Sequence, residues 1–303
     1  MLIGVILQRK NLVLLAVLDI LLLVFFAVFI ILPQGSPGSE GVIMVGAGDI
    51  ASCGNENDSA TALLLDSIPG VVFTLGDTVY DNGSAQEFLD CYSDNWGRHK
   101  DRTLPALGNH DYNTPGAKAY FDYFDYAGES DKGYYSYNYG DWHVVVLNSN
   151  CNELGGCAPD SEQLEWLRKD LTEADSKCTL AYMHHPRYSS GTHGSQNWLI
   201  PIWNALYAGG VEIALAGHDH SYERFAPQDP FGTLDPEFGV RQFVVGTGGI
   251  NHYEFLNTAP NSEVKNNDSY GVLKLTLKKE SYDWAFVPVE GSTFTDSGSG
   301  TCH

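Results

Sequence analysis

The chain has 303 residues, of which 43% are hydrophobic, and it carries a formal net charge of −21. This apolar content is sufficient for a packed core and excludes a chain that is disordered throughout. The strong negative charge repels nucleic-acid backbones and excludes a general nucleic-acid-binding protein.

An apolar run fills positions 12 to 32, interrupted by Asp19 and preceded by Arg9 and Lys10. Its length suits a helix that spans a hydrocarbon core of roughly 30 Å, and the basic flank places the rest of the chain outside. A cleaved signal peptide is the alternative, although its apolar region is usually about 7–15 residues long. We predict a signal anchor or transmembrane segment over 1–33 and a linker over 34–41. The protein is then exported, and is either membrane-anchored or, after cleavage, secreted.

Apolar runs rich in β-branched residues recur after this linker, starting at 41, 71, 141, 178, 211 and 241. Helical patterns lie between several of them, over 160 to 175 with Asp160 as the cap, and over 197 to 210 before a glycine pair. This alternation predicts an α/β protein. Near the C-terminus, 269 to 279 and 281 to 290 alternate apolar and polar side chains, which predicts an antiparallel hairpin. We expect one domain over 42–303.

The six cysteines indicate disulfide bonds, because an even number in an exported chain is typical of paired thiols. The sequence does not choose between the pairings. Cys151 with Cys157 is the simplest pair, since only a short loop separates them. The six are Cys53, Cys91, Cys151, Cys157, Cys178 and Cys302.

Five strand-like runs end in Asp, Asn or His. Turn chemistry accounts for one such residue but not for all five together. Ligands gather at the carboxyl ends of the strands in open α/β sheets, so we predict a metal site there. The residues at the ends of the runs are Asp49, Asp77, Asn109 with His110, His184 with His185, and His218 with His220.

The candidate donors comprise three oxygen ligands and three imidazoles, which is too many for one catalytic zinc ion with three protein ligands. They suit two ions about 3.5–4 Å apart that share one carboxylate, and we expect Asp77 to be shared. The mixture of oxygen and imidazole donors favours iron, manganese or zinc over calcium.

The order and spacing of these motifs resemble those of the calcineurin-like metallophosphoesterases, and most closely the short, single-domain purple acid phosphatases. The superfamily usually begins with Asp-x-His, whereas Asp49 is followed here by Ile50 and Ala51. Tyr80, three residues after Asp77, is typical of the purple acid phosphatases. The resemblance implies a four-layer αββα sandwich of two mixed sheets. The motifs are GD (48–49), GDTVY (76–80), GNHD (108–111), AYMH (181–184) and GHDH (217–220).

The resemblance also implies a ligand set. Ferric iron would occupy a first site made by Asp49, Asp77, Tyr80 and His220. Iron, zinc or manganese would occupy a second site made by Asp77, Asn109, His184 and His218. A packing aromatic is the alternative for Tyr80.

Two further histidines complete the expected site. His193 lies nine residues after His184, and by resemblance it contacts phosphate or donates a proton, as does His110. An exposed loop histidine is the alternative for His193. Asn109 and His110 would hold the phosphate oxygens.

The expected activity is hydrolysis of small phosphate monoesters by a metal-bound hydroxide, of the acid phosphatase type. A phosphodiesterase that acts on nucleotides or lipid headgroups is the alternative enzyme. A non-catalytic surface-binding protein is the alternative from another class.

Overall fold

The computed structural model describes residues 41–303, so the predicted signal or transmembrane segment lies outside the described residues. Within residues 41–303, no helix is long and apolar enough to cross a membrane. Attachment to a membrane through residues 1–33 therefore stays a prediction.

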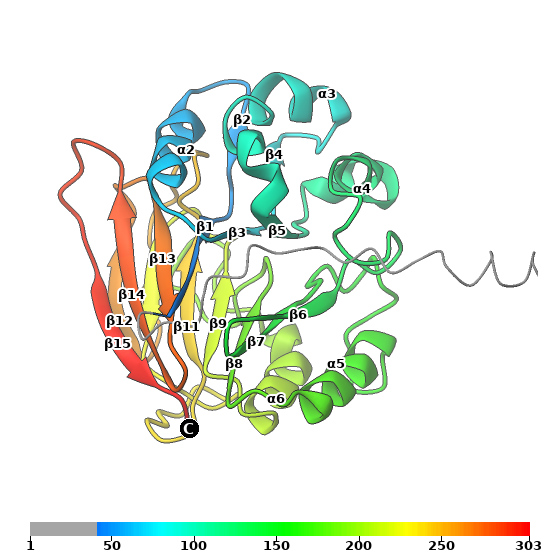
Figure 1. The fold of residues 1–303 in the computed structure, drawn as a ribbon, viewed down its shortest axis with the longest axis vertical. Coiled ribbons are helices and arrows are strands. Elements are labelled where there is room, and N and C mark those ends of the chain that lie inside the picture. The colour runs from blue at the N-terminus through cyan, green and yellow to red at the C-terminus, as the bar shows by residue number, and fades with distance from the viewer. Residues whose placement is uncertain (1–40) are drawn as a thin grey trace, which may run out of the picture. The chain divides into compact units, whose positions relative to one another are not determined.

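The strands form two large mixed sheets and one small parallel pair (Figure 1). The six-stranded sheet has the order β15-β14-β13-β1-β3-β5, in which β1, β3 and β5 are parallel. The seven-stranded sheet has the order β12-β10-β11-β9-β8-β7-β6, in which β7, β8, β9 and β11 are parallel. The predicted α/β fold with mixed sheets is therefore confirmed.

The strands of the six-stranded sheet are β1 (Val42–Ala47), β3 (Val71–Leu75), β5 (Thr103–Ala106), β13 (Gly271–Leu277), β14 (Ser281–Pro288) and β15 (Ser297–Thr301). Those of the seven-stranded sheet are β6 (Tyr135–Tyr139), β7 (Trp142–Val146), β8 (Cys178–Tyr182), β9 (Ile213–Ala216), β10 (Tyr222–Phe225), β11 (Arg241–Val245) and β12 (Ser262–Asn266). The small pair is β2 (Ala51–Ser52) with β4 (Val79–Tyr80). The α-helices are α2 (Asn57–Ser67), α3 (Ala85–Glu87), α4 (Lys118–Tyr123), α5 (Glu162–Glu173) and α6 (Ile200–Ala208). A π-helix, η1 (Phe88–Tyr92), and the 3-10 helices η2 (Trp96–Arg102), η3 (Asp111–Asn113), η4 (Pro115–Ala117) and η5 (Asn197–Leu199) complete the set.

The strand patterns follow from burial. Strands β3, β7, β8 and β9 are buried along their whole length, as expected for parallel strands covered on both faces. The predicted C-terminal hairpin is confirmed, because β13 and β14 pair antiparallel and the inward positions of β14 alternate. Strand β15 has no apolar pattern. Its Gly298 and Gly300 lie directly against the rings of Trp284 and Tyr282, where a larger residue would collide.

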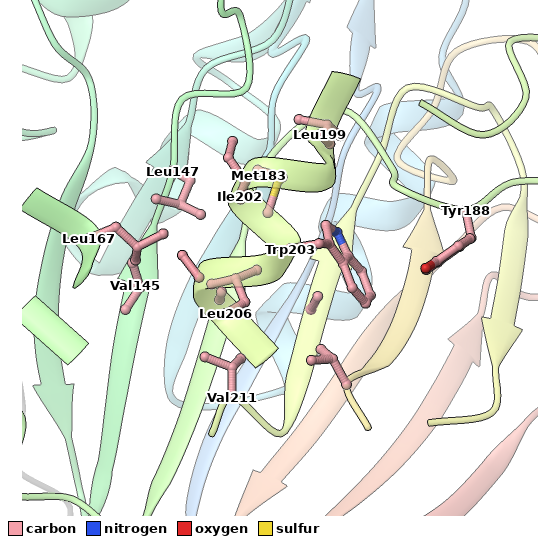
Figure 2. Packing of buried hydrophobic residues seen from close by; sticks show 14 of the residues in the cluster. Val145, Leu147, Leu167, Met183, Tyr188, Leu199, Ile202, Trp203, Leu206 and Val211 are labelled. Atoms are coloured by element: carbon pink, nitrogen blue, oxygen red, sulfur yellow. The ribbon is translucent and has the colours of Figure 1, made fainter. Parts of the chain in front are cut away.

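Helices α5 and α6 pack against the seven-stranded sheet (Figure 2). Leu167 of α5 and Trp203 of α6 are buried there together with Val145 of the sheet. Both helices were expected, but α5 begins after Ser161 and not after Asp160, because Ser161 is the last residue with extended backbone. This apolar layer fixes the strands that carry two of the polar motifs.

The two large sheets pack face to face through aromatic side chains. Phe73 of β3 and Tyr182 of β8 have ring centroids 6.0 Å apart, and Trp142 Nε1 donates a hydrogen bond to the carbonyl of Lys278 at 2.6 Å. On the six-stranded sheet, helix α2 contacts β13. The ring contact and the Trp142 hydrogen bond hold the two sheets together.

All six cysteines form disulfide bonds, which join Cys53 with Cys91, Cys151 with Cys157, and Cys178 with Cys302. The expected Cys151–Cys157 bond is confirmed. Disulfide bonds persist in oxidising compartments, so their presence supports the expected export of this domain.

Asp58 of α2 should make the stability of the fold depend on pH. Its side chain is 1% exposed and accepts a hydrogen bond from Asn95 Nδ2 at 2.9 Å. Burial raises its pKa from 3.8 to about 6. Because the folded pKa is the higher one, the protonated carboxyl favours folding. That contribution is complete below about pH 4 and is lost as the pH rises through the folded pKa.

We therefore expect Asp58→Asn to be more stable than the parent protein at pH 7, by about 1–3 kcal/mol, and equally stable at pH 4. Urea unfolding at the two pH values measures the difference. Asp122→Asn, at an exposed position, is the control and should show no such gain. A difference of the same size at both pH values would contradict the assignment.

Candidate metal centre

The carboxyl ends of the parallel strands of both sheets meet at one place. His184, which follows β8, contacts the carbonyl of Leu75 at the end of β3 through Nδ1 at 2.7 Å. The His218 backbone N–H, after β9, donates to Asp49 Oδ2 at 2.8 Å. Three of the predicted motifs therefore come from the six-stranded sheet and two from the seven-stranded sheet.

Glycine precedes several of these residues because the backbone there passes very close to a carboxylate. A Cβ atom on Gly217 would lie 2.5 Å from Asp49 Oδ2, and one on Gly108 would overlap the carboxylate of Asp77. Asp49, Asp77 and His218 also have positive φ angles of 60°, 48° and 71°. Such strained backbone in non-glycine residues is typical of functional sites.

A first group of donors surrounds the phenol of Tyr80. Its Oη atom lies 2.8 Å from Asp49 Oδ1 and 2.9 Å from Asp77 Oδ2. The Nε2 atom of His220 lies 3.3 Å from the same oxygen. These four side chains are buried. The residues expected for the first metal site are thus brought together.

A second group surrounds Nε2 of His184. This atom lies 3.0 Å from Asn109 Oδ1 and 3.1 Å from His218 Nδ1. It lies 3.3 Å from Asp77 Oδ2, the same oxygen that contacts Tyr80. The residues expected for the second site therefore also converge, and Asp77 Oδ2 belongs to both groups.

The buried acidic side chains of the centre would be stabilised by nearby positive charge. Burial raises the pKa of Asp49 to about 7, and burial with the two nearby carboxylates raises the pKa of the Tyr80 phenol well above its usual value. Burial opposes charge on His184, yet the adjacent Asp77 carboxylate outweighs it and raises the pKa to about 9. Cations would supply this charge, and the mixed oxygen and imidazole donors fit iron, zinc or manganese.

His110 lies beside Tyr80 of the first donor group, and His193 lies beside His218 of the second. The His110 backbone N–H donates to Asp77 Oδ1 at 2.7 Å, and its ring lies 4.4 Å from the ring of Tyr80. His193 is exposed, and its ring centroid lies 4.2 Å from that of His218. Both are therefore placed to reach a molecule bound at the centre.

Three other residues contribute: Tyr253 and Asp219, which were given no role from the sequence, and His185, which the sequence placed beside His184 at the end of its run. The ring of Tyr253 stacks on His220 at 3.9 Å. Asp219 accepts the backbone N–H of His193 at 2.9 Å, and its place between two candidate ligands in GHDH was an available signal. His185 lies 4.3 Å from His218 but bonds Ser149 Oγ through Nδ1. Tyr253 carried no sequence signal, because it lies in a loop after β11.

Residues 43–222 match the calcineurin-like phosphoesterase family. The chain belongs to this family. Strands β2 to β9 and all five motifs lie within the matched range, so the matched region contains the candidate centre.

Purple acid phosphatases are among the relatives of this phosphoesterase. Purple acid phosphatase 15 of Arabidopsis thaliana is 29% identical over 72% of this chain and 47% of its own length. The probable purple acid phosphatase 20 of the same plant is 32% identical over 55% of this chain and 40% of its own length. The chain thus spans about half the length of these curated relatives or less.

A solved structure has the same fold. Purple acid phosphatase PPD1 from yellow lupin (Lupinus luteus) superposes with a TM-score of 0.72 at 20% identity, covering 88% of this chain and 54% of that one. At this identity the likeness concerns the fold alone.

Gly217→Ala should disturb the centre directly, because the added methyl group would meet Asp49 Oδ2 and the carbonyl of Leu75. We expect the metal content to fall at least about tenfold, measured by elemental analysis after dialysis, while the circular dichroism spectrum stays folded. Gly54→Ala is the matched control, since its nearest neighbour is Ser52 Oγ at 3.5 Å. An unchanged metal content in Gly217→Ala would show that Asp49 is not a ligand.

Proposed function

We propose that this phosphoesterase hydrolyses phosphate monoesters with two metal ions, as an acid phosphatase. One observation carries the proposal. Asp77 Oδ2 lies within 2.9 Å of Tyr80 Oη and 3.3 Å of His184 Nε2, and so belongs to two four-donor groups at once. A shared carboxylate is what a pair of ions about 3.5–4 Å apart requires.

The proposed ligands of the first ion are Asp49, Asp77, Tyr80 and His220, and we propose ferric iron there because a phenolate is a hard anionic donor. The proposed ligands of the second ion are Asp77, Asn109, His184 and His218, which suit iron, zinc or manganese. When bound, the two ions lower the pKa of a water molecule and offset the charge of the phosphate.

We assign proton donation and phosphate orientation to His193, His110 and Asn109, which lie beside the two donor groups. His110 Nδ1 lies 2.8 Å from the carbonyl of Asp81, so Nδ1 donates to this carbonyl and the ring is held in a fixed orientation. Among residues 41–303, His193 uses only its backbone groups in hydrogen bonds. We therefore propose His193 as the donor of the proton to the leaving alkoxide, and His110 with Asn109 as the residues that orient the phosphate.

The wider organisation stays part of the proposal. Residues 42–303 would form the catalytic domain, and residues 1–33 would export it and anchor it to a membrane or be cleaved. The substrates would be small phosphate esters, since a chain with a net charge of −21 attracts a phosphate only through the local charge of the centre.

Asp77→Asn tests the shared carboxylate. Asparagine tolerates the positive φ at this position, so the fold should persist while the charge is lost. We expect the turnover of 4-nitrophenyl phosphate to fall at least about a thousandfold, with Asp122→Asn as the control at an exposed site. Activity within tenfold of the parent would overturn the proposal. Parallel assays with bis(4-nitrophenyl) phosphate decide between monoesters and diesters, and no turnover of either with a full metal content favours a binding protein.

Tyr80→Phe tests the first ion. A ferric ion bound to a phenolate absorbs visible light by charge transfer, so the iron-loaded parent should be coloured and Tyr80→Phe colourless at equal iron content. Tyr253→Phe is the matched control, because its ring stacks on His220 without a place among the four donors. A colourless parent protein that holds its full iron would refute Tyr80 as a ligand.

A further inference from the structure

A cavity of about 750 Å³ lies beside the candidate metal centre. Asn109 lines this cavity and also contacts His184 within the second donor group. A cavity of this size holds a drug-sized organic group. Because Asn109 belongs to both, a molecule whose phosphate lies at the centre can place its remaining part in the cavity.

Trp198 forms part of the cavity wall, and the ring of His185 lies between it and the proposed ligand His218. The ring of His185 is 4.3 Å from that of His218 and 5.2 Å from that of Trp198. The indole is 42% exposed, and its Nε1 donates to Gln196 Oε1 at 2.9 Å, which holds its orientation. It therefore offers a flat apolar face to whatever enters the cavity.

His185 forms a fixed part of the cavity wall. Its backbone N–H donates to Ser149 Oγ at 2.9 Å, and Ser149 Oγ lies 2.8 Å from His185 Nδ1. These two contacts with Ser149 fix the orientation of the imidazole ring in the wall.

Another part of the wall is a loop closed by the Cys151–Cys157 disulfide bond. Inside it, the N–H of Gly156 donates to the carbonyl of Cys151 at 2.7 Å, and the N–H of Glu153 donates to the carbonyl of Asn150 at 2.9 Å. A short loop with these bonds and a covalent closure is ordered before any ligand arrives, which lowers the entropy cost of binding.

The charge of the lining limits what the cavity accepts. Among the described residues that line it, Glu153 is the only acidic side chain and there is no lysine or arginine; the other polar side chains are those of asparagine, serine, tyrosine, histidine and tryptophan residues. A second phosphate or a carboxylate would find no cation there and would face Glu153. The lining suits neutral or positively charged groups.

We propose that this cavity binds the alcohol portion of the phosphate ester, and that it selects a neutral or cationic group with a flat ring. The proposal rests on the proposed function, because it names the substrate class of the same centre. Trp198 stacks on the ring of the leaving group, and Glu153 faces its substituent.

Trp198→Ala tests the stacking face. With 2-naphthyl phosphate we expect KM to rise about tenfold with kcat nearly unchanged, whereas KM for ethyl phosphate changes less than about twofold. Trp198→Phe should restore most of the affinity. Phe231→Ala, at an aromatic residue that is 71% exposed and does not line the cavity, is the control. Equal changes for the two substrates would overturn the proposal.

Glu153→Gln tests the charge. The parent protein should bind 4-(aminomethyl)phenyl phosphate about fivefold better, by KM, than 4-carboxyphenyl phosphate, and Glu153→Gln should remove most of this preference. Glu173→Gln, at an exposed position of α5, should leave it intact. A preference that survives in Glu153→Gln would overturn the role of Glu153.

Calorimetry with 2-naphthol, the leaving alcohol alone, separates the two proposals. Binding that is lost in Trp198→Ala supports the cavity even if no monoester is hydrolysed, in which case the proposed function fails alone. Hydrolysis of monoesters without binding of 2-naphthol, and without an effect of Trp198→Ala, overturns the cavity proposal and leaves the function standing.

Discussion

The arrangement depends on one carboxylate. Asp77 receives the His110 backbone N–H on Oδ1 at 2.7 Å and places Oδ2 between Tyr80 and His184. It can do so only because β3 ends there and because Gly108 leaves space for it. A larger residue at position 108, or a shift of one sheet against the other, would separate the two donor groups.

Burying so many polar groups costs free energy, and the rest of the fold offsets this cost. Three residues of the centre hold positive φ angles, and Asp49 is fully buried. Continuous apolar strands and the layer under α5 and α6 stabilise the scaffold. The rigidity that keeps the donors within 3.5 Å of one another therefore originates in side chains that never contact a ligand.

The local features were predictable from the sequence, and the long-range ones were not. Apolar runs ending in Asp, Asn or His located the donors, because each donor directly follows its strand in the sequence. The alternation in 269–290 located the hairpin. Strand β15 was missed because Gly298 and Gly300 fit against Trp284 and Tyr282 by shape alone. Tyr253 and most of the cavity wall lie in loops, whose contacts form only after the sheets have packed.

The Cys178–Cys302 bond joins the start of β8 to the residue after β15, and so links the seven-stranded sheet to the six-stranded one. It lies at the end of β8 away from His184. The disulfide bond therefore joins the two sheets at one end, and the donor groups lie at the other end. The covalent bond would keep the sheets together whether or not the donors hold metal ions.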